Sequence, residues 1–538
     1  MRISRVCIPI IAAVAVFGSI LVSLSCATST SKPPSTVAYA ISGTVTYAGS
    51  QTGRIYMKVS SYHGTSIASP GPFAIRGLAP GSYVLSAWMD NGSPQTGVRS
   101  ALSPSGSLSV TVSGDLPGQI ISLSDPSPTP GPGIPTNVTV FPSNSCALVQ
   151  WDSPRDANGN VLAQYYNIYY STSGTVSPTT GIKKHVQAST ERNGIFVNGL
   201  VDGQTYFFVV TAELGGAESA ASTPAASATI GAPTGLNNVS GTVTFPGAAT
   251  GPMYVVLYSD AAVPFFQCIE NPASPQPYSI SGVANGAYLA FACVDMNNDG
   301  MMGIGDIRNG SNLGDSAGQT LTVNGNLAGM DQTLSAANAS VEVLTSHFSP
   351  AYTGIGDQYS ARLYVAGEMK LPVQVSVISG PNEIVPHDIS PGPLSLLFIN
   401  LGSTRPNVGD TYVLTVTYSD GTSENLTDSV TAVLDSFAEN LTTSGTDPGV
   451  PIFNWTAPTS PPSTYTYQIY VNGGGELLWS YPSLVSVMPS WQTSVVFNLD
   501  GKARQSSLTA GNKYWLLVLV HDAAGNRAAT KASYTPAS

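Results

Sequence analysis

The sequence predicts an all-β protein, a string of five β-sandwiches that follows an N-terminal export signal. Gly and Pro account for 54 and 40 of the 538 residues, which indicates many turns. Charged residues make up only 9% of the chain, against about 25% in an ordinary soluble protein. Apolar and polar residues alternate in many short runs and no window shows sustained helical periodicity, so we expect strands throughout.

Net charge and hydrophobic content exclude two classes of protein. The formal net charge is −11 and the longest basic run is Lys183-Lys184, so the electrostatic footprint of a nucleic-acid-binding protein is absent. Hydrophobic residues form 42% of the chain, enough to bury several cores, which excludes wholesale disorder. We therefore expect a multidomain protein without a nucleic-acid partner.

Residues 1–26 form the expected export signal, and residues 27–40 a polar tether. Two arginines precede an apolar run of 19 residues from Val6 to Leu24, which is typical of a secretory signal. Ser25 and Cys26 follow. This end resembles the cleavage site of bacterial lipoproteins, although the family's usual Leu three residues before the cysteine is Ser23 here. The resemblance implies lipid on Cys26 and a location at the outer membrane or cell surface.

Two alternatives to lipid attachment stay open. Cleavage after Ala27 would release a secreted protein, because Ser25 and Ala27 form a small-residue recognition pair. An uncleaved signal would act as an anchor, since 19 apolar residues can just span a bilayer.

An internal duplication relates residues 41–125 to residues 238–335, with a Pro-rich linker at 126–135 after the first copy. Two motifs recur in the same order: Ser42 to Gly49 (SGTVTYAG) as Ser240 to Gly247 (SGTVTFPG), and Ile75 to Tyr83 (IRGLAPGSY) as Ile280 to Tyr288 (ISGVANGAY). Their alternating apolar residues predict strands with one buried face. The motifs resemble the carboxypeptidase regulatory-like, or transthyretin-like, family, which implies two β-sandwiches.

A second pair of related segments spans residues 136–231 and 445–538. The shared motifs are Trp151-Asp-Ser-Pro154 with Trp455-Thr-Ala-Pro458, Tyr166-Asn-Ile-Tyr169 with Tyr467-Gln-Ile-Tyr470, and Leu200-x-x-Gly-x-x-Tyr206 with Leu508-x-x-Gly-x-x-Tyr514. A buried Trp on an early strand and a Tyr that ties a corner are physical needs of a two-sheet sandwich. Both segments resemble fibronectin type III domains.

Residues 339–435 are expected to form another immunoglobulin-like sandwich. Tyr412 to Tyr418 alternates cleanly between apolar residues and threonine, and the turn Ser419-Asp-Gly421 follows.

One loop has the spacing of a calcium site. Oxygen ligands stand at loop positions 1, 3, 5, 7 and 12, namely Asp295, Asn297, Asp299, the Met301 carbonyl and Asp306. Calcium prefers six to eight hard oxygen ligands, and this spacing wraps them about one point. The loop resembles those of EF-hands and dockerins, which implies one bound Ca²⁺, but position 12 is Asp rather than Glu and no helix flanks it. The alternative is a polar turn that binds nothing.

Gly314-Asp-Ser316-Ala-Gly318 matches the Gly-x-Ser-x-Gly pattern of a nucleophile elbow, but its context does not. An elbow needs a strand before it and a helix after it, whereas a Gly/Asn-rich loop precedes this motif and a strand at Gln319–Val323 is expected to follow. We therefore assign no catalytic residue and keep a Ser316 hydrolase as a remote alternative.

Three cysteines belong to the predicted domains. Cys268 and Cys293 lie in one domain of an exported chain, so we expect a disulfide between them. The alternative is two reduced thiols in the core. Cys146 is out of phase with Ala147, Val149 and Trp151, and is expected to be a partly exposed free thiol.

Trp479, Tyr481 and Trp491 lie in a stretch without charge after Glu476. Exposed aromatic rings can stack on sugars, so these residues are a candidate carbohydrate platform, and the alternative is that they belong to the core.

These observations predict an exported, lipid-anchored, non-catalytic surface protein for binding or structural display. Its expected partners are the membrane, through the N-terminal lipid, and a polysaccharide or surface protein. Because such sandwiches host many functions, the alternative is a carbohydrate-binding accessory component of an extracellular polysaccharide-processing system.

Overall fold

The computed structural model describes residues 38–537, apart from 93–94, 96, 98, 128–129, 189–191, 232, 236, 260–262, 310–318, 382–385 and 483–487. Strand accounts for 55% of the structure and helix for 1%, which confirms the predicted all-β class. The expected signal with Cys26 lies outside the described residues. In the part of the chain that the structure describes, no helix is long and apolar enough to cross a membrane.

The first segment forms two sheets around one core. Its strands are β1 (Tyr39–Tyr47), β2 (Arg54–Lys58), β3 (Gly64–Ile67), β4 (Pro72–Leu78), β5 (Gly81–Asp90), β6 (Ser105–Val112) and β7 (Leu116–Leu123). The sheets have the orders β4-β1-β7 and β3-β2-β5-β6. Ile41, Ile55 and Ile75 are fully buried between them.

The second segment is also a sandwich. Its strands are β8 (Thr136–Ser143), β9 (Cys146–Asp152), β10 (Tyr165–Ser171), β11 (Ile182–Gln187), β12 (Arg192–Asn198), β13 (Thr205–Leu214), β14 (Ala217–Glu218) and β15 (Ala226–Thr229). Sheet β12-β9-β8 packs on sheet β11-β10-β13-β14, with β15 also paired to β13. Trp151 is fully buried, as the motif predicts, and its ring meets the Tyr166 ring edge-on at 5.2 Å.

The third segment wraps an eight-stranded sheet around one core. Its strands are β16 (Asn237–Thr244), β17 (Met253–Tyr258), β18 (Phe265–Ile269), β19 (Gln276–Val283), β20 (Gly286–Val294), β21 (Ile307–Asn309), β22 (Gln319–Val323) and β23 (Gln332–Ser335). The order is β18-β17-β20-β21-β23-β16-β19, with β22 also paired to β20. Val239, Val255 and Ile280 are buried in this core.

The duplicated Ser-Gly-Thr-Val motif has the same role in both copies. Its glycine lies where another strand or turn crosses closely: a Cβ on Gly43 would stand 1.8 Å from the Gln119 carbonyl oxygen, and a Cβ on Gly241 would stand 2.3 Å from that of Met330. Only glycine permits such an approach without a shift of the backbone.

The last two predicted segments share one sheet. The strands are β24 (Ala339–Phe348), β25 (Gln358–Gly367), β26 (Pro372–Ser379), β27 (His387–Ile389), β28 (Leu394–Gly402), β29 (Thr411–Tyr418), β30 (Ser423–Ser429), β31 (Glu439–Ser444), β32 (Ile452–Thr456), β33 (Tyr465–Gly473), β34 (Glu476–Tyr481), β35 (Met488–Pro489), β36 (Ser494–Val496), β37 (Tyr514–Asp522) and β38 (Arg527–Tyr534), with one helical turn, α2 (Pro350–Thr353). The shared sheet has the order β28-β25-β24-β38-β37-β33-β34, and β35 pairs with β33. Because β24 and β38 pair in parallel, the two segments are joined edge to edge, although each keeps its own core.

The shared sheet is covered on each half by a separate smaller sheet. Sheet β27-β26-β29-β30 packs on the half nearer β28, and sheet β31-β32-β36 packs on the half nearer β34.

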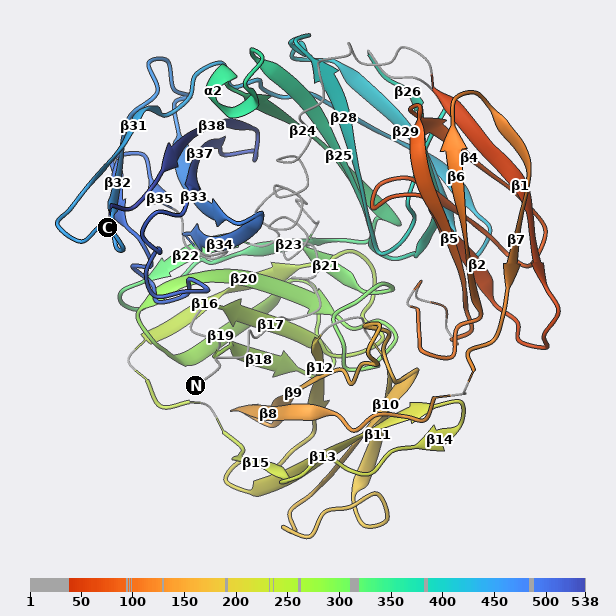
Figure 1. Ribbon diagram of the computed structural model, residues 1–538. Helices are drawn as coiled ribbons and strands as arrows, with labels where there is room; N and C mark the ends of the chain where they lie inside the picture. Colours follow the sequence, from red (N-terminus) through yellow and green to blue (C-terminus); the bar gives the residue numbers. More distant parts are fainter. Residues whose placement is uncertain are drawn as a thin grey trace.

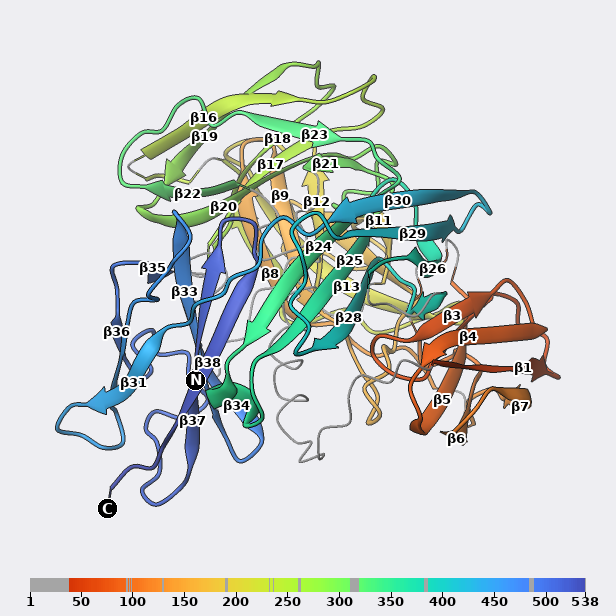
Figure 2. The same ribbon diagram turned by 90° about the horizontal axis from the view of Figure 1, so that it is seen from above.

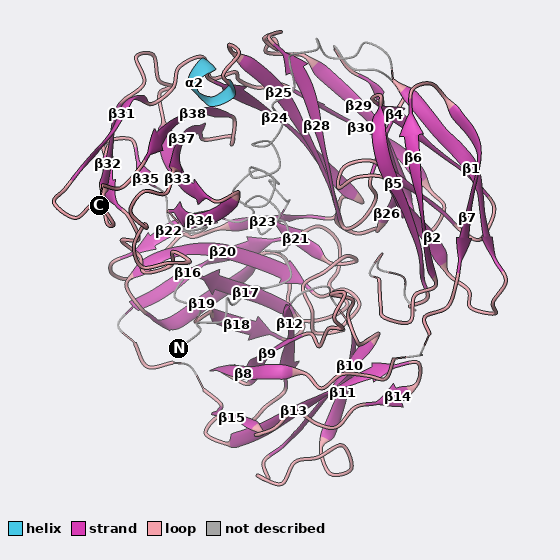
Figure 3. Ribbon diagram, in the orientation of Figure 1, coloured by secondary structure: helices cyan, strands magenta, loops and turns pink. Residues whose placement is uncertain are grey.

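The segments curve around so that the first one meets the fourth (Figures 1 and 2). Arg76 of β4 forms an ion pair with Asp388 of β27 at 2.8 Å, and His63 forms an isolated β-bridge with Ile389. We call this contact the clasp. Arg308 of the third segment pairs with Glu368, beside β25, at 2.7 Å. The segments thus lie around a ring, although not in chain order, because the last segment is joined to the fourth through β38 and β24 (Figure 3).

Candidate functional site

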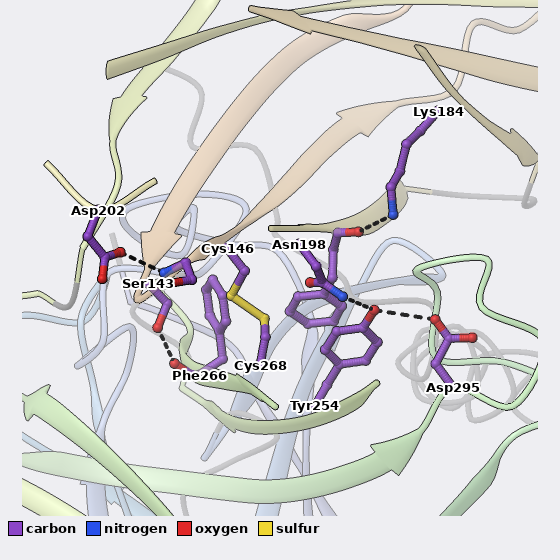
Figure 4. The surroundings of a disulfide bond; sticks show 11 residues. Ser143, Cys146, Lys184, Asn198, Asp202, Tyr254, Phe266, Cys268 and Asp295 are labelled. Carbon is purple, nitrogen blue, oxygen red and sulfur yellow. Dashed lines mark hydrogen bonds between the residues drawn. A yellow bond between two sulfur atoms is a disulfide. The ribbon is translucent and has the colours of Figure 1, made fainter. Parts of the chain in front are cut away.

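The predicted cysteines and the acidic loop lie together where the second segment contacts the third. We call this contact the stapled junction (Figure 4). It brings two of the features predicted from the sequence, the cysteines and the calcium-type loop, into one site.

The disulfide joins Cys146 to Cys268, with a Cα–Cα distance of 6.5 Å. The predicted pair Cys268–Cys293 is therefore wrong, and Cys293 is a buried free thiol. The register explains this outcome. Cys268 of β18 and Cys293 of β20 both stand opposite Tyr254 of β17, on its two sides. Two strand spacings separate their Cα atoms by about 10 Å, beyond the roughly 7 Å that a disulfide tolerates.

The expectation of a partly exposed Cys146 is also wrong, because β9 is buried on both faces. Ala147, Val149 and Trp151 face the core of the second segment. Cys146 and Leu148 face the third segment instead, in a cluster that also holds Phe196, Tyr254 and Phe266.

Aromatic stacking and a hydrogen bond support the disulfide. The Phe196 and Tyr254 rings stack with their centroids 4.1 Å apart. The Ser143 hydroxyl donates to the Phe266 carbonyl oxygen at 2.6 Å. The junction therefore combines a covalent bond with a buried apolar contact, and this combination holds the two sandwiches in one orientation.

The acidic loop connects β20 to β21 and begins and ends with a buried carboxylate. The Asp295 carboxylate accepts the N–H groups of Asp299 at 3.1 Å and Gly300 at 2.8 Å. The Asp306 carboxylate accepts those of Met296 at 3.0 Å and Gly303 at 2.8 Å. These bonds hold the loop in a closed turn.

The tip of the loop docks on the second segment. The Phe196 N–H donates to the Gly300 carbonyl oxygen at 2.7 Å. Gly300 has φ of +79°, and a Cβ there would stand 2.7 Å from the Phe196 carbonyl oxygen. Both observations require glycine, which explains the residue at loop position 6 without reference to a metal. The Met301 side chain packs against the core of the second segment.

A chain of polar contacts links the loop to the middle of the junction. The Asn198 amide donates to the Tyr254 hydroxyl at 3.0 Å, and that hydroxyl donates to the Asp295 carboxylate at 3.3 Å (Figure 4). Burial, followed by the charge of Asp295, raises the pKa of Tyr254, which keeps the hydroxyl protonated as a donor.

The charged forms of the buried loop carboxylates, Asp295 and Asp306, are disfavoured in the folded protein, and a bound cation would favour them. Burial is the largest cause of a raised pKa at both Asp295 and Asp306, and neighbouring carboxylates add to it. The pKa of Asp306 rises to about 7.

The geometry of the loop does not itself form a metal cluster. Among the residues that the structure describes, no three Asp, Glu, His or Cys side chains are grouped so that they could hold a metal ion. Asn297 and Asp299 bond to each other, with the Asn297 amide 3.0 Å from the Asp299 carboxylate. Calcium binding by Asp295, Asn297, Asp299, Met301 and Asp306 therefore stays a prediction.

The predicted aromatic platform does not form as a unit. Trp479 is only 2% exposed and belongs to the core of the last segment, since it stands opposite the core residue Val471. Asp500 accepts its indole N–H at 2.8 Å. Tyr481 is half-buried and stacks on Trp479 at 5.6 Å. Trp491 is 80% exposed, so it alone keeps the accessibility that a sugar contact needs.

The Gly-x-Ser-x-Gly motif around Ser316 and the lipidation residue Cys26 both lie outside the described residues. Neither the hydrolase alternative nor the lipid anchor gains or loses support from the fold.

Of the comparisons with known proteins, the match to a family model bears on the second segment. No curated protein matches the chain. A solved structure, the FN1–FN3 domains of chicken CNTN1, matches over 76% of this chain and 100% of its own at 10% identity, with a TM-score of 0.16. The family model of the fibronectin type III domain matches residues 133–227. The fibronectin type III fold expected there is thus confirmed.

Proposed function

We propose that this chain is an exported, non-catalytic surface protein that is anchored through Cys26 and holds β-sandwiches in fixed positions for binding or display. The observation that carries this proposal is the closed arrangement of the segments. Flexible linkers would let the sandwiches move independently, but here a disulfide, a shared sheet and two ion pairs with buried carboxylates connect them.

The chemistry of these connections supports a location outside the cytoplasm. Structural disulfides persist mainly in oxidising compartments, and Cys146–Cys268 closes a separation of 122 residues between two segments. A display protein gains from such a bond because its surfaces keep their relative positions.

Small-angle X-ray scattering on the purified chain tests the closed arrangement. A compact chain of about 500 residues has a radius of gyration of about 23 Å. We expect a value within several ångströms of this figure. A much larger value, typical of a string of separate sandwiches, would contradict the proposal.

Mass analysis of the N-terminal peptide tests the anchor. We expect acyl mass on Cys26 and partition of the protein into detergent. A soluble mature protein that begins at Thr28 would refute lipid attachment.

A hydrolase screen of the wild type and the Ser316→Ala variant tests the non-catalytic character. We expect neither protein to turn over any substrate. Turnover that disappears in the variant would replace the display proposal with a hydrolase.

Exposure of Trp491 favours a second candidate function, a carbohydrate-binding accessory component. A single ring supplies one stacking contact only, so this candidate needs further contacts elsewhere on the surface.

A further inference from the structure

Two lysines flank one tryptophan on the shared sheet. They lie on the face that points away from the core of the last segment, residues 445–538. In β37, Tyr514, Leu516 and Val518 face that core, so the alternating residues Trp515 and Leu517 face the opposite side. The register of β38 adds a residue to this face, because Lys531 stands opposite Leu517.

The ring contacts are specific. The Lys513 ammonium lies 4.5 Å from the centroid of the Trp515 ring. The Lys531 ammonium lies 4.7 Å from the same ring and 5.0 Å from the centroid of the Tyr352 ring. The four residues Lys513, Trp515, Lys531 and Tyr352 therefore alternate between cation and aromatic ring, and we call them the lysine–aromatic surface. Tyr352 is buried and supports Lys531 from below, so Trp515 is the ring that a ligand can reach.

The scaffold fixes Tyr352 beside β38. The helical turn α2 begins after Ser349, whose hydroxyl accepts the Tyr352 N–H. The Ser349 N–H donates to the Ala529 carbonyl oxygen of β38 at 3.0 Å, and its hydroxyl bonds to that of Thr530 at 3.0 Å. Figure 1 shows α2 next to the end of β38. The surface is thus assembled from two segments of the ring and depends on the parallel pairing of β24 and β38.

The two ammonium groups lack a carboxylate partner within the described residues. One other lysine–ring contact of this chain includes an ion pair: Lys370 lies 5.6 Å from the Tyr418 ring and also 2.8 Å from the Asp420 carboxylate. Lys513 and Lys531 have the ring contacts alone. Their mutual repulsion adds to burial in lowering the pKa of Lys531. In a chain of net charge −11, this is a local excess of positive charge.

We propose that the lysine–aromatic surface binds an acidic polysaccharide, a polymer of uronic acids. Each sugar unit of such a polymer combines a carboxylate, which pairs with an ammonium group, and an apolar ring face, which stacks on an aromatic side chain. The Lys513 side chain is exposed, and an exposed cation–ring contact is weak, so a sugar can displace its stem from the indole while its ammonium group pairs with the carboxylate. This inference rests on the proposed binding function and names its ligand class.

Affinity electrophoresis tests the proposal on the secreted chain. The protein is run in native gels that contain polygalacturonate, or amylose as a neutral polymer. We expect polygalacturonate alone to retard the wild type. The double variant Lys513→Gln/Lys531→Gln should bind about tenfold more weakly, because each lysine loses its ion pair with a carboxylate of the polymer. Added salt should weaken the binding of the wild type.

The matched control is Lys370→Gln, which removes a lysine with a similar ring contact and the same charge. We expect its binding to equal that of the wild type. Equal melting temperatures would show that all three proteins fold. Equal weakening by the control and by a single Lys531→Gln change would overturn the proposal, because only net charge would then matter.

Two further results would also overturn the proposal. One is retardation of the wild type by amylose as strong as that by polygalacturonate. The other is binding to vesicles that contain an anionic lipid, lost in the double variant, without binding to polygalacturonate, which would assign the surface to membranes. Neither result alters the scattering radius or the acyl mass on Cys26, so a failure of this inference is distinguishable from a failure of the proposed function.

Discussion

The stapled junction and the clasp close the same ring by opposite chemistry. The stapled junction combines the Cys146–Cys268 disulfide with stacked aromatic rings. The clasp is polar: the Arg76 guanidinium bonds twice to the Asp388 carboxylate, at 2.8 and 2.9 Å, and the Ser376 hydroxyl donates to the same carboxylate at 2.6 Å.

Imidazole rings complete the clasp. His63 and His387 stack with their centroids 4.6 Å apart, and the His63 ring bonds to the Ser60 hydroxyl at 2.9 Å. The comparison teaches that a reducing agent acts on the stapled junction alone, whereas protonation of a buried imidazole acts on the clasp alone. The two can therefore be opened separately, and the predictions below use this difference.

Loss of the disulfide should have the largest effect. In the chain-entropy model, a cross-link over about 120 residues stabilises by about 5 kcal/mol, an upper-end figure. We expect the double change Cys146→Ser/Cys268→Ser to lower the free energy of unfolding by up to this amount in urea titrations. Cys293→Ser is the control, and it should leave the disulfide intact. Equal stability of the double variant and the wild type would show that aromatic packing alone holds the stapled junction.

Removal of the Asp388 carboxylate should open the clasp. Asp388 is 1% exposed and Arg76 40% exposed, so Asp388→Ala strands buried donors but leaves the arginine partly solvated. We expect a loss of about 2–3 kcal/mol, below the 3–5 kcal/mol of a fully buried pair. Hydrogen exchange in β4 and β27 should increase.

The chain offers a matched pair for comparison. Arg405 and Asp435 form the same double contact at 2.7 Å, but both are about half exposed. Asp435→Ala should therefore cost less than about 1 kcal/mol. A cost equal to that of Asp388→Ala would show that burial does not strengthen the clasp.

Acid should weaken the clasp through His63, whereas at the stapled junction the raised pKa of Asp306 favours protonation in the folded state and so has the opposite sign. Burial, followed by the neighbouring His387, lowers the pKa of His63 from 6.5 to about 3. The folded state keeps this ring neutral while the unfolded state takes up a proton below pH 6.5, so stability falls from pH 6.5 down to about pH 3. The loss at pH 5 is about 2 kcal/mol. Melting temperatures between pH 7 and pH 4 measure it.

Charged groups close to His63 also affect how much stability its protonation costs. Arg76 and Asp388 lie in the same contact, and the Asp388 carboxylate would attract a protonated ring, which reduces the loss. His63→Asn should flatten the pH profile, whereas His185→Asn, at an exposed position of β11, should not. An unchanged profile for His63→Asn would assign the acid sensitivity to other groups.

The sequence predicted those features that depend on contacts within one segment. The corner tyrosines of the second repeat are an example: the Tyr206 hydroxyl accepts the Val201 N–H at 3.4 Å and the Tyr514 hydroxyl accepts the Thr509 N–H at 2.9 Å. In each case the spacing is five residues, so the motif itself fixes the contact. The buried Trp151 and the strand at Tyr412–Tyr418 were predictable for the same reason.

Contacts between segments were not predictable from such motifs, although one signal was present. All six residues of β17, Met253 to Tyr258, are buried, and a strand without polar alternation is typical of a sheet covered on both faces. The apolar sequence of β17 therefore indicates that another segment covers the outer face of the third segment, but it does not identify that segment. The pairing of Cys146 with Cys268 depends on that partner, which is why the sequence placed the disulfide within one segment.

Apart from the Asp435→Ala control, calcium should have the smallest effect, and it bears on the stapled junction alone. With a dissociation constant of about 10⁻³ M, typical of extracellular modules, 10 mM calcium would stabilise the chain by about 1.4 kcal/mol. The melting temperature should rise in calcium but not in magnesium, and Asp295→Asn/Asp299→Asn should remove the rise. Asp156→Asn is the control variant and should leave the rise unchanged. The Asp156 carboxylate also closes a turn, by accepting the N–H groups of Asn158 and Asn160, but that turn contains no second aspartate.

Hydrogen exchange locates the ion. Since the loop tip bonds to Phe196, bound calcium should also slow hydrogen exchange in β12. A rise in melting temperature without that protection would place the ion elsewhere, and no rise at all would show that the loop is a turn held by its own N–H groups.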